Sequence, residues 1–304
     1  IWIVNIVLSI LTLGIYSAWA KVRNKQYFYG NTLLDGASFE YTAKPLTILK
    51  GRALAFVVIA LYYALTAYVP PLYLPYVYGA FALFFIAVFP WIVVKGLQFN
   101  ARYSQYRNVS FTFNGTYKEA FRVFILWPLA GILIVFIPYS WHRRAQFFVG
   151  NSGYGTAQFE FSAEVKEYYS IFGKLILISL AAIVVVWIPI VNIAVYVLIG
   201  AYYFSHTTNL MYSNSLLKTN GFVANYDTYS YAWLMFTNTL GIALTLGLYT
   251  PWAHVRTAQY KADHITVVAS ESLNDFAQAE SEQVNALAEG FADAHDVFDI
   301  NVGI

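Results

Sequence analysis

The sequence contains no cysteine and unusually few charged residues. Without cysteine, the chain can have no disulfide framework, no thiolate metal site and no cysteine nucleophile. Charged residues make up 11% of the 304 residues, whereas an ordinary soluble domain carries about a quarter. Hydrophobic residues reach 59% and the mean hydropathy is +0.53. This composition indicates a membrane protein.

Common signatures of catalysis are also missing. The five histidines show no HExxH or other metal-ligand spacing, and neither a GxSxG nor a P-loop pattern occurs. No ionisable residue lies near the centre of an apolar segment, which disfavours an acidic proton relay. The basic residues adjoin apolar segments, so they do not form the solvent-facing surface that nucleic acid binding needs. We expect no enzyme, cofactor, metal or nucleic acid, with a lipid-active enzyme as an alternative.

Long apolar segments are what the sequence does contain. About 20 residues are needed to cross the bilayer as a helix. Seven segments come close to this length: 1–20, 53–69, 76–94, 123–141, 171–188, 190–205 and 232–253. The connectors "VPPLYLPY" (69–76) and "WIPIVN" (187–192) carry proline and no charge, and they predict the tight outer turns of two transmembrane hairpins.

One stretch of sequence recurs along the chain. "LTLGIYSAWAKVRNKQY" (11–27) returns as "LTLGLYTPWAHVRTAQY" (244–260), and "RNKQYFYGNTLLDGASFEY" (23–41) aligns with "RRAQFFVGNSGYGTAQFEF" (143–161). Such repeats are first of all a structural signature. We predict a membrane domain over 1–262, built from about two and a half pseudo-repeats (1–122, 123–231 and 232–262), in which 1–20, 123–142 and 232–253 are repeated segments that enter the membrane.

The basic connectors bear on whether these three segments cross. If all seven segments crossed, the basic connector that contains Arg143 and Arg144 would face outside, against the positive-inside rule. If the three repeated segments are re-entrant, every basic connector lies on one face, and we prefer this topology. Pro128 and Gly241 are expected bend points, and Gly14 and Gly247 are expected to allow close packing or a turn.

Short alternating runs in the basic connectors predict five strands: "SFEY" (38–41), "VSFTF" (109–113), "QFEF" (158–161), "GFVANY" (221–226) and "HITVVA" (264–269). The expected fold class is therefore an α-helical polytopic membrane protein. It has two transmembrane hairpins, three repeated and preferably re-entrant segments, and a small cytoplasmic β layer.

The end of the chain has a different charge. All 18 Lys and Arg lie within residues 1–261, whereas 263–304 contains only acids among these charged types. We predict an acidic cytoplasmic tail with an amphipathic helix whose face follows Leu273, Phe276, Glu280, Val284, Leu287 and Phe291. "DVFDINVGI" (296–304) is expected to form a strand. The tail either docks on its own basic strand layer, which we prefer, or binds a partner protein.

The doubled motif, together with "NTLLDGASFEY" and the ending "FDINVGI", resembles the YjgN family of bacterial inner-membrane proteins, classed as a domain of unknown function. The resemblance covers nearly the whole chain. The middle copy, "IPYSWHRR", departs from the motif because it lacks the Leu-Thr-Leu-Gly run. The resemblance implies the bacterial inner membrane, and it implies neither a reaction nor active-site residues.

Three groups of candidate site residues follow from charge and position. Basic residues beside the segments can contact anionic lipid headgroups or can serve only as topogenic charge: Lys21, Arg23, Arg143, Arg144 and Arg256. Polar residues within the segments can bond between helices or contact a solute: Asn5, Thr12, Asn238 and Thr245. Equivalent strand carboxylates are expected to form cytoplasmic ion pairs: Glu40 and Glu160.

For function, we expect first a channel or transporter for a small solute, ion or lipid, by analogy with other repeated helical hairpins. The alternative is a non-enzymatic scaffold or envelope-maintenance protein that recruits lipid or a partner through its basic face and acidic tail. Membrane lipids and a second copy of the chain are the expected partners.

Overall fold

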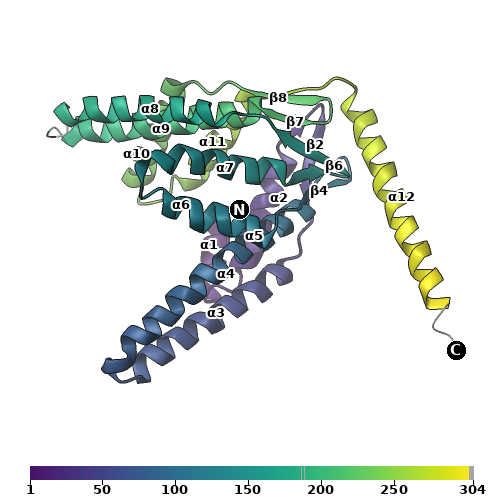
Figure 1. Cartoon of the computed structure of the whole chain (residues 1–304), viewed down its shortest axis with the longest axis horizontal. Helices are drawn as coiled ribbons and strands as arrows, with labels where there is room; N and C mark the ends of the chain where they lie inside the picture. Colours follow the sequence, from purple (N-terminus) through teal and green to yellow (C-terminus); the bar gives the residue numbers. More distant parts are fainter. Residues whose placement is uncertain (186, 188, 301–304) are drawn as a thin grey trace. The chain divides into compact units, whose positions relative to one another are not determined.

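The computed structural model describes residues 1–185, 187 and 189–300 (Figure 1). The chain forms two compact units. Unit 1 comprises Ile1–Ile125 and the chain from Ala277 onward, and unit 2 comprises Leu126–Phe276. Both units are mainly helical, and each contains an antiparallel sheet.

The helices of unit 1 are α1 (Trp2–Leu11), α2 (Ser17–Gly30), α3 (Pro45–Tyr68), α4 (Leu74–Arg102) and α5 (Tyr117–Phe121), and a π-helical turn (Arg122–Leu126) follows them. Those of unit 2 are α6 (Trp127–Ala130), α7 (Ile137–Gly150), α8 (Val165–Ala182), α9 (Pro189–Ser213), α10 (Thr228–Leu244) and α11 (Thr250–His264). The last helix, α12 (Leu273–Ile300), begins in unit 2 and continues into the segment assigned to unit 1.

All five predicted strands are confirmed, and each belongs to an antiparallel sheet. Unit 1 contains β1 (Leu33–Leu34), β2 (Ala37–Tyr41), β3 (Ser104–Tyr106) and β4 (Val109–Phe113), paired in that order. Unit 2 contains β5 (Ser152–Tyr154), β6 (Ala157–Phe161), β7 (Ser215–Leu217), β8 (Asn220–Ala224) and β9 (Ile265–Val268), also paired in order. Strands β1, β3, β5 and β7 were not predicted, and each forms a tight hairpin with the strand that follows it.

Long helices join consecutive hairpins of each sheet. In unit 1, the chain between β2 and β3 forms α3 and α4, which pack side by side (Figure 1). In unit 2, the chain between β6 and β7 forms α8 and α9 in the same way. Proline fixes the φ angle at the first turn of α3, and Pro70 follows its last residues. By length and composition, Pro45–Tyr68 and Pro71–Arg102 are the two helices in the described residues that could span a membrane.

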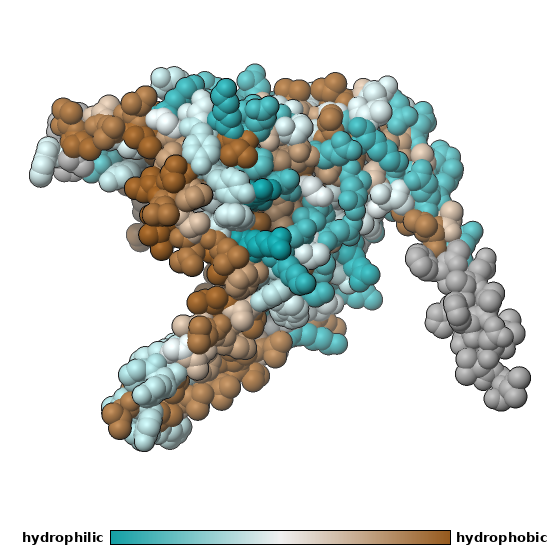
Figure 2. All heavy atoms as spheres, viewed as in Figure 1, coloured by the Kyte–Doolittle hydropathy of each residue, from teal (hydrophilic) through white to brown (hydrophobic). Residues whose placement is uncertain are grey.

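The apolar side chains of these two helices are largely uncovered. No residue of α3 is buried, and α4 buries only Pro90 and Val94. Figure 2 shows apolar residues gathered along this helix pair, and further apolar areas lie elsewhere on the same view. A core helix of a soluble protein would bury such a surface.

None of the three repeated segments forms one continuous helix. α1 ends at Leu11, and the chain reverses through Leu13 and Gly14, whose φ angles are +49° and +88°. The same turn follows α10, where Leu246 and Gly247 have φ angles of +49° and +94°. The prediction of a turn at the two glycines is confirmed, because glycine adopts positive φ without steric cost.

The chain reverses a few residues after each of the two predicted bend points. Gly241 lies inside α10, where a Cβ atom would approach the Tyr249 ring to 2.6 Å, so glycine there permits close packing. Pro128 lies in the first turn of α6, a position that tolerates proline, and the chain leaves helical structure only after Ala130.

The end of the chain also differs from the prediction. α12 continues to Ile300, so residues 296–300 are helical, and residues 301–304 lie outside the described part. The helix that begins at Leu273 therefore extends further than the sequence suggested. On the predicted face, Phe276 and Glu280 are buried while Val284 and Leu287 are exposed. The side chain of Phe291 lies outside the described residues.

Candidate functional site

A cavity of about 130 Å³ opens between α7, α8 and α9 of unit 2. Its walls are formed by Trp141, Arg144, Ala145, Phe148, Tyr168, Tyr203, Thr207, Thr208 and Met211. Four of these side chains are aromatic, one is cationic and none is acidic. The cavity therefore combines apolar walls with hydroxyl groups and one guanidinium group.

Helical periodicity brings these residues together. Trp141, Arg144 and Phe148 are three and four residues apart on α7, and Tyr203, Thr207 and Met211 are four apart on α9, so each set shares a helix face. The two faces meet where the Trp141 ring lies edge-on to Tyr203, with ring centroids 4.6 Å apart.

Tyr168 lines the cavity from α8. Its side chain is 1% exposed and packs with Ala145 and Ala163 in the core of unit 2. The His142 ring contacts Tyr168 edge-on at 5.5 Å, and its Nε2 atom lies 3.0 Å from the Ala163 carbonyl oxygen. The Tyr168 hydroxyl has no hydrogen-bond partner within the described residues, which is costly for a buried polar group.

The cavity lies at one end of the α8–α9 pair. Tyr168 is three residues after the start of α8, and Thr207 is six residues before the end of α9, which places both within about 9 Å of the helix ends that join β6 and β7. Exposed aliphatic side chains run from Ile176 in α8 to Val184, two residues after its end. Along α8, the cavity therefore lies between the strands and this aliphatic surface.

The five predicted lipid contacts have different surroundings. Arg144 lines the cavity, but its neighbour Arg143 donates hydrogen bonds to the Tyr139 hydroxyl and to Gln146 Oε1, each at 2.8 Å. Arg256 donates to Asn238 Oδ1 at 2.8 Å, and Arg23 lies 5.8 Å from the centroid of the Tyr16 ring.

Lys21, the fifth predicted lipid contact, is exposed and acts electrostatically on a neighbouring lysine. The pKa of Lys25 is lowered chiefly by burial and further by the charge of Lys21. The Lys25 Nζ atom donates to Asn100 Oδ1 at 2.6 Å and lies 4.5 Å from the Tyr41 ring centroid.

The four predicted intramembrane polar residues make bonds within their own helical hairpins. Asn5 Nδ2 donates to Asn24 Oδ1 at 3.3 Å, and Asn238 Nδ2 donates to the Ala253 carbonyl oxygen at 3.3 Å. The hydroxyls of Thr12 and Thr245 each donate to the carbonyl four residues earlier and accept the backbone N–H four residues later. They thereby stabilise the two equivalent turns. Solute contact stays a prediction.

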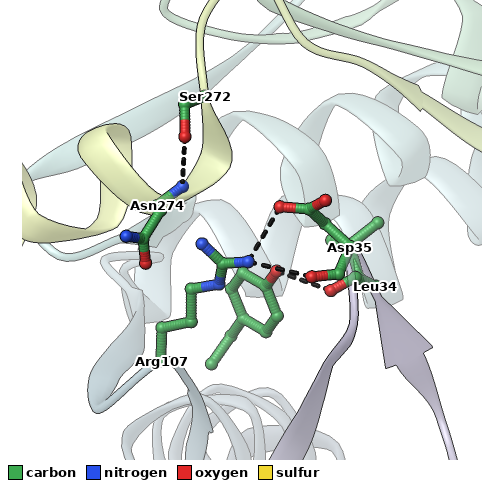
Figure 3. A network of polar contacts seen from close by, with 6 residues as sticks. Leu34, Asp35, Arg107, Ser272 and Asn274 are labelled. Carbon is green, nitrogen blue, oxygen red and sulfur yellow. Dashed lines mark hydrogen bonds and ion pairs between the residues drawn. The ribbon is translucent and has the colours of Figure 1, made fainter.

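The ion pairs expected at Glu40 and Glu160 do not form within the described residues. Both side chains are exposed, and their register partners, Gln105 and Leu216, carry no charge. The ion pair of this region is instead between Arg107 Nη2 and Asp35 Oδ2 at 2.8 Å (Figure 3). It joins the β1–β2 and β3–β4 turns.

Most of the cavity residues were missed by the sequence analysis, which named only Arg144. The available signal was the spacing of Trp141, Arg144 and Phe148, together with that of Tyr203, Thr207 and Met211. Within the described residues, no group of three or more His, Asp and Glu side chains could hold a metal ion.

The sequence model of one family, described as "Bacterial protein of unknown function (DUF898)", matches residues 1–194 and 182–294. The chain is also similar to "Inner membrane protein YjgN" of Salmonella typhimurium (strain LT2), with 30% identity over 140 residues, which are 45% of this chain and 34% of that protein. The protein of the same name from Escherichia coli O157:H7 is 28% identical over 42% of this chain and 31% of its own length.

The Escherichia coli (strain K12) protein of that name is 30% identical over 42% of this chain and 31% of its own length. These alignments span about a third of the length of the curated relatives. No solved structure matches the chain. The resemblance to YjgN proteins that the repeated motif suggested is confirmed.

Proposed function

Because the chain belongs to the DUF898 family of bacterial proteins of unknown function, we propose that it is an integral inner-membrane protein of the kind its relatives' names describe. In this proposal, α3, α4, α8 and α9 cross the bilayer as two hairpins, and the sheets and the acidic tail lie on the cytoplasmic side. The observation that carries it is α3, a helix of 24 residues with no buried side chain. Lipid would cover such a surface favourably.

The three repeated segments then act as re-entrant hairpins. α10 has 17 residues, a length of about 25 Å, which falls short of the ~30 Å hydrocarbon core. The turns of the first and third segments present apolar side chains outward, with Leu13 and Leu246 each 95% exposed. Ile132 occupies the corresponding turn after α6 and is 76% exposed. Apolar tips of this kind favour insertion into lipid.

The element boundaries support pseudo-repeats as well. α2 and α7 each have 14 residues, and their bounds differ by a constant 120 positions, as do those of β2 and β6. In both halves a helical hairpin precedes a β-hairpin, a long helix pair and a second β-hairpin. α10, α11 and β9 repeat the beginning of this order.

The activity that we assign is the passage or binding of a small solute, ion or lipid, as in a channel or transporter. Half-length helices that meet polar groups inside the membrane are typical of transporter sites. The α1–α2 hairpin holds two such groups, Asn5 Oδ1 and the Tyr16 hydroxyl, which are buried without a partner in the described part of the chain. A scaffold is the second candidate, favoured by the exposed Val284 and Leu287 on the acidic tail helix.

Cysteine labelling tests the topology, and the cysteine-free sequence makes single cysteines unambiguous. Single cysteines are introduced at three exposed positions near the strands, namely Gln158, Ser213 and Ser270. They should react with a membrane-impermeant maleimide only in opened vesicles. Leu72, in the α3–α4 turn and 75% exposed, should react in intact cells. Reaction of Gln158 in intact cells would overturn the re-entrant arrangement, because the middle segment would then cross.

Flux measurements separate the two candidate activities. The protein is reconstituted in liposomes, and the exchange of fluorescent phospholipid between leaflets and the leakage of small anions and cations are recorded. A rate above that of protein-free liposomes, lowered by Asn5→Leu, supports transport. Rates equal to the protein-free control for every solute would leave the scaffold as the better account.

A further inference from the structure

Arg23, Arg143 and Arg256 occupy equivalent positions in the three copies of the repeated motif. Arg143 and Arg256 are partly buried, and each donates two hydrogen bonds to side chains of its own helical hairpin. Arg23 is exposed and has no hydrogen-bond partner in the part of the chain that the structure describes. Among the described contacts of these three arginines, Arg23 therefore keeps its N–H groups open to a ligand.

A difference between glycine and leucine explains why the first arginine stays exposed. In the third copy the Tyr249 ring lies against Gly241, where an added Cβ would come within 2.6 Å of it, and the Tyr249 hydroxyl accepts from Arg256 at 3.3 Å. Leu8 holds the equivalent position in α1, so the Tyr16 ring cannot pack against that helix in the same way. The Tyr16 hydroxyl accordingly receives no hydrogen bond within the described residues.

A second equivalent acceptor is also directed away from Arg23. Gln146 accepts from Arg143 at 2.8 Å, whereas the equivalent Gln26 donates its Nε2 hydrogen to a carbonyl oxygen of β2 at 3.4 Å. Arg23 lies instead 5.8 Å from the centroid of the Tyr16 ring, a cation–π contact that occupies none of its N–H groups.

The charges beside Arg23 favour an anion. Lys21, Arg23 and Lys25 lie close together on α2, and none of them forms an ion pair within the described residues. Lys21 and Lys25 are four residues apart, a spacing at which like charges repel, and the charge of Lys21 adds to burial in lowering the pKa of Lys25. An anion would reduce this repulsion, and a phosphate group offers oxygens that match the planar guanidinium.

The surroundings of Arg23 indicate the source of the phosphate. The α1–α2 turn exposes Leu13 and Ile15, and the Tyr16 and Trp19 rings stack after it with centroids 6.3 Å apart. Such rings favour the headgroup layer of a membrane. Arg23 lies six residues after the start of α2, about 9 Å along the helix axis, which is the depth of the headgroups if the turn inserts into lipid.

We propose that Arg23 binds the phosphate group of an anionic phospholipid, whereas its two equivalents hold their hairpins together. The assignment rests on the proposed insertion of the α1–α2 turn into the membrane. It names one ligand class and one direct contact for the protein.

The test uses the full chain in maltoside detergent, which contains no phosphate. Phosphatidylglycerol, diacylglycerol with the same acyl chains and inorganic phosphate are titrated separately, and binding is followed by native mass spectrometry and by the shift in Tm. Phosphatidylglycerol should bind and raise the Tm, whereas diacylglycerol should not. Arg23→Gln should weaken binding of the first phosphatidylglycerol about fivefold or more, as expected for a basic residue at an anionic lipid surface.

Arg143→Gln and Arg256→Gln are the matched controls, because each removes the same charge from the equivalent position of another copy. They should bind phosphatidylglycerol like the unmodified protein. Without lipid they should lower the Tm, since hydrogen bonds are lost, whereas Arg23→Gln should leave it unchanged. Arg23→Lys keeps the charge and should bind more tightly than Arg23→Gln, a comparison that holds even if a control variant fails to fold.

Three results would overturn the proposal: equal weakening by all three glutamine substitutions, equal binding of diacylglycerol, or a lower lipid-free Tm for Arg23→Gln with unchanged phosphatidylglycerol binding. The last would mean that Arg23 donates to the buried Asn5 Oδ1 and Tyr16 hydroxyl, as Arg256 does in its own hairpin. Inorganic phosphate that binds through Arg23 as tightly as phosphatidylglycerol would assign the site to free phosphate and overturn the lipid source.

The cysteine labelling is independent of this binding experiment. If the labelling contradicts the proposed topology while Arg23-dependent binding persists, only the membrane arrangement fails. If the labelling agrees and binding does not depend on Arg23, only the phosphate contact fails.

Discussion

Single residues explain why the α10–α11 hairpin closes tightly. The Tyr249 ring lies against the bare Cα of Gly241, and Arg256 donates to both Asn238 Oδ1 and the Tyr249 hydroxyl, at 2.8 and 3.3 Å. The equivalent residues of the α1–α2 hairpin, Asn5 and Tyr16, receive no such arginine hydrogen bond in the described residues, although Arg23 lies 5.8 Å from the centroid of the Tyr16 ring. The same motif thus has two different polar interiors.

Gly241→Ala should destabilise the protein. The added Cβ would lie 2.6 Å from the Tyr249 ring, and overpacking typically costs about 1–3 kcal/mol, which outweighs the helix propensity gained. Gly79→Ala is the control, since that glycine lies in α4 with nothing within 4 Å, and it should be neutral or stabilising. Thermal unfolding in detergent compares the two. Equal Tm values would contradict the packing role.

At the scale of elements, helix caps fix where several helices begin. Asp227 precedes α10 and its carboxylate accepts the Ser230 N–H at 2.8 Å. Thr116 and Glu119 form a capping box at α5, and Glu164 and Glu167 form one at α8. These caps position the helices directly after the strands, and so they determine where the helices leave the sheets.

Asp227 should make stability depend on acid pH. The hydrogen bond from the Ser230 backbone N–H lowers the pKa of its carboxyl group. A carboxyl with a lowered folded-state pKa stabilises the fold above its ordinary pKa, and this contribution is lost as the pH falls through the folded-state value. The Tm of the unmodified protein should therefore fall more steeply below about pH 4 than that of Asp227→Asn, which keeps a cap but does not titrate. Parallel curves would exclude this role.

The turn of the α1–α2 hairpin should tolerate no charge if it inserts into lipid. Leu13→Asp should reduce the amount of folded protein in the membrane, because a carboxylate in hydrocarbon costs roughly 2.5–3.5 kcal/mol. Aspartate accepts the positive φ of this position, so backbone strain does not explain a loss. Leu72→Asp, at a similarly exposed leucine in the α3–α4 turn, should have little effect. Equal yields in size-exclusion chromatography would argue against insertion of the tip.

At the scale of the whole molecule, the end of the chain completes unit 2. β9 pairs with β8 along four residues, and the Phe276 ring stacks on Tyr154 with centroids 6.0 Å apart. Lys218 Nζ lies 5.7 Å from the centroid of the same ring. At the start of α12, the Asn274 N–H donates to the Ser272 hydroxyl at 3.2 Å (Figure 3). The acidic tail therefore begins as part of the fold.

Two truncations should have different consequences. Ending the chain after Ala262 removes β9 and leaves β8 with an unpaired edge, so folded protein should be lost or its Tm lowered strongly. Ending it after Leu287 keeps the buried Phe276, Ala277 and Glu280 and should leave the Tm unchanged. A large loss of stability in the variant that ends after Leu287 would show that the remainder of α12 contributes to the fold.

The sequence by itself indicated a membrane protein, identified the family and predicted the five longer strands. These properties follow from local quantities, namely composition, a specific repeated motif and two-residue alternation. The short strands β1, β3, β5 and β7 were missed because two or three residues show no periodicity, although Asp35-Gly36 marked one turn. The tail strand was wrong because local alternation in 296–300 competes with a helix that begins far upstream at Leu273.

The tertiary structure alone decided which polar residues meet. The sequence treated Arg143 and Arg144 as one pair of charges, but helix geometry turns Arg143 toward Tyr139 and Gln146 and places Arg144 in a cavity with residues from α8 and α9. Strand register likewise sets Glu40 opposite the uncharged Gln105. A side chain's partners depend on the packing of distant segments, which no local pattern encodes.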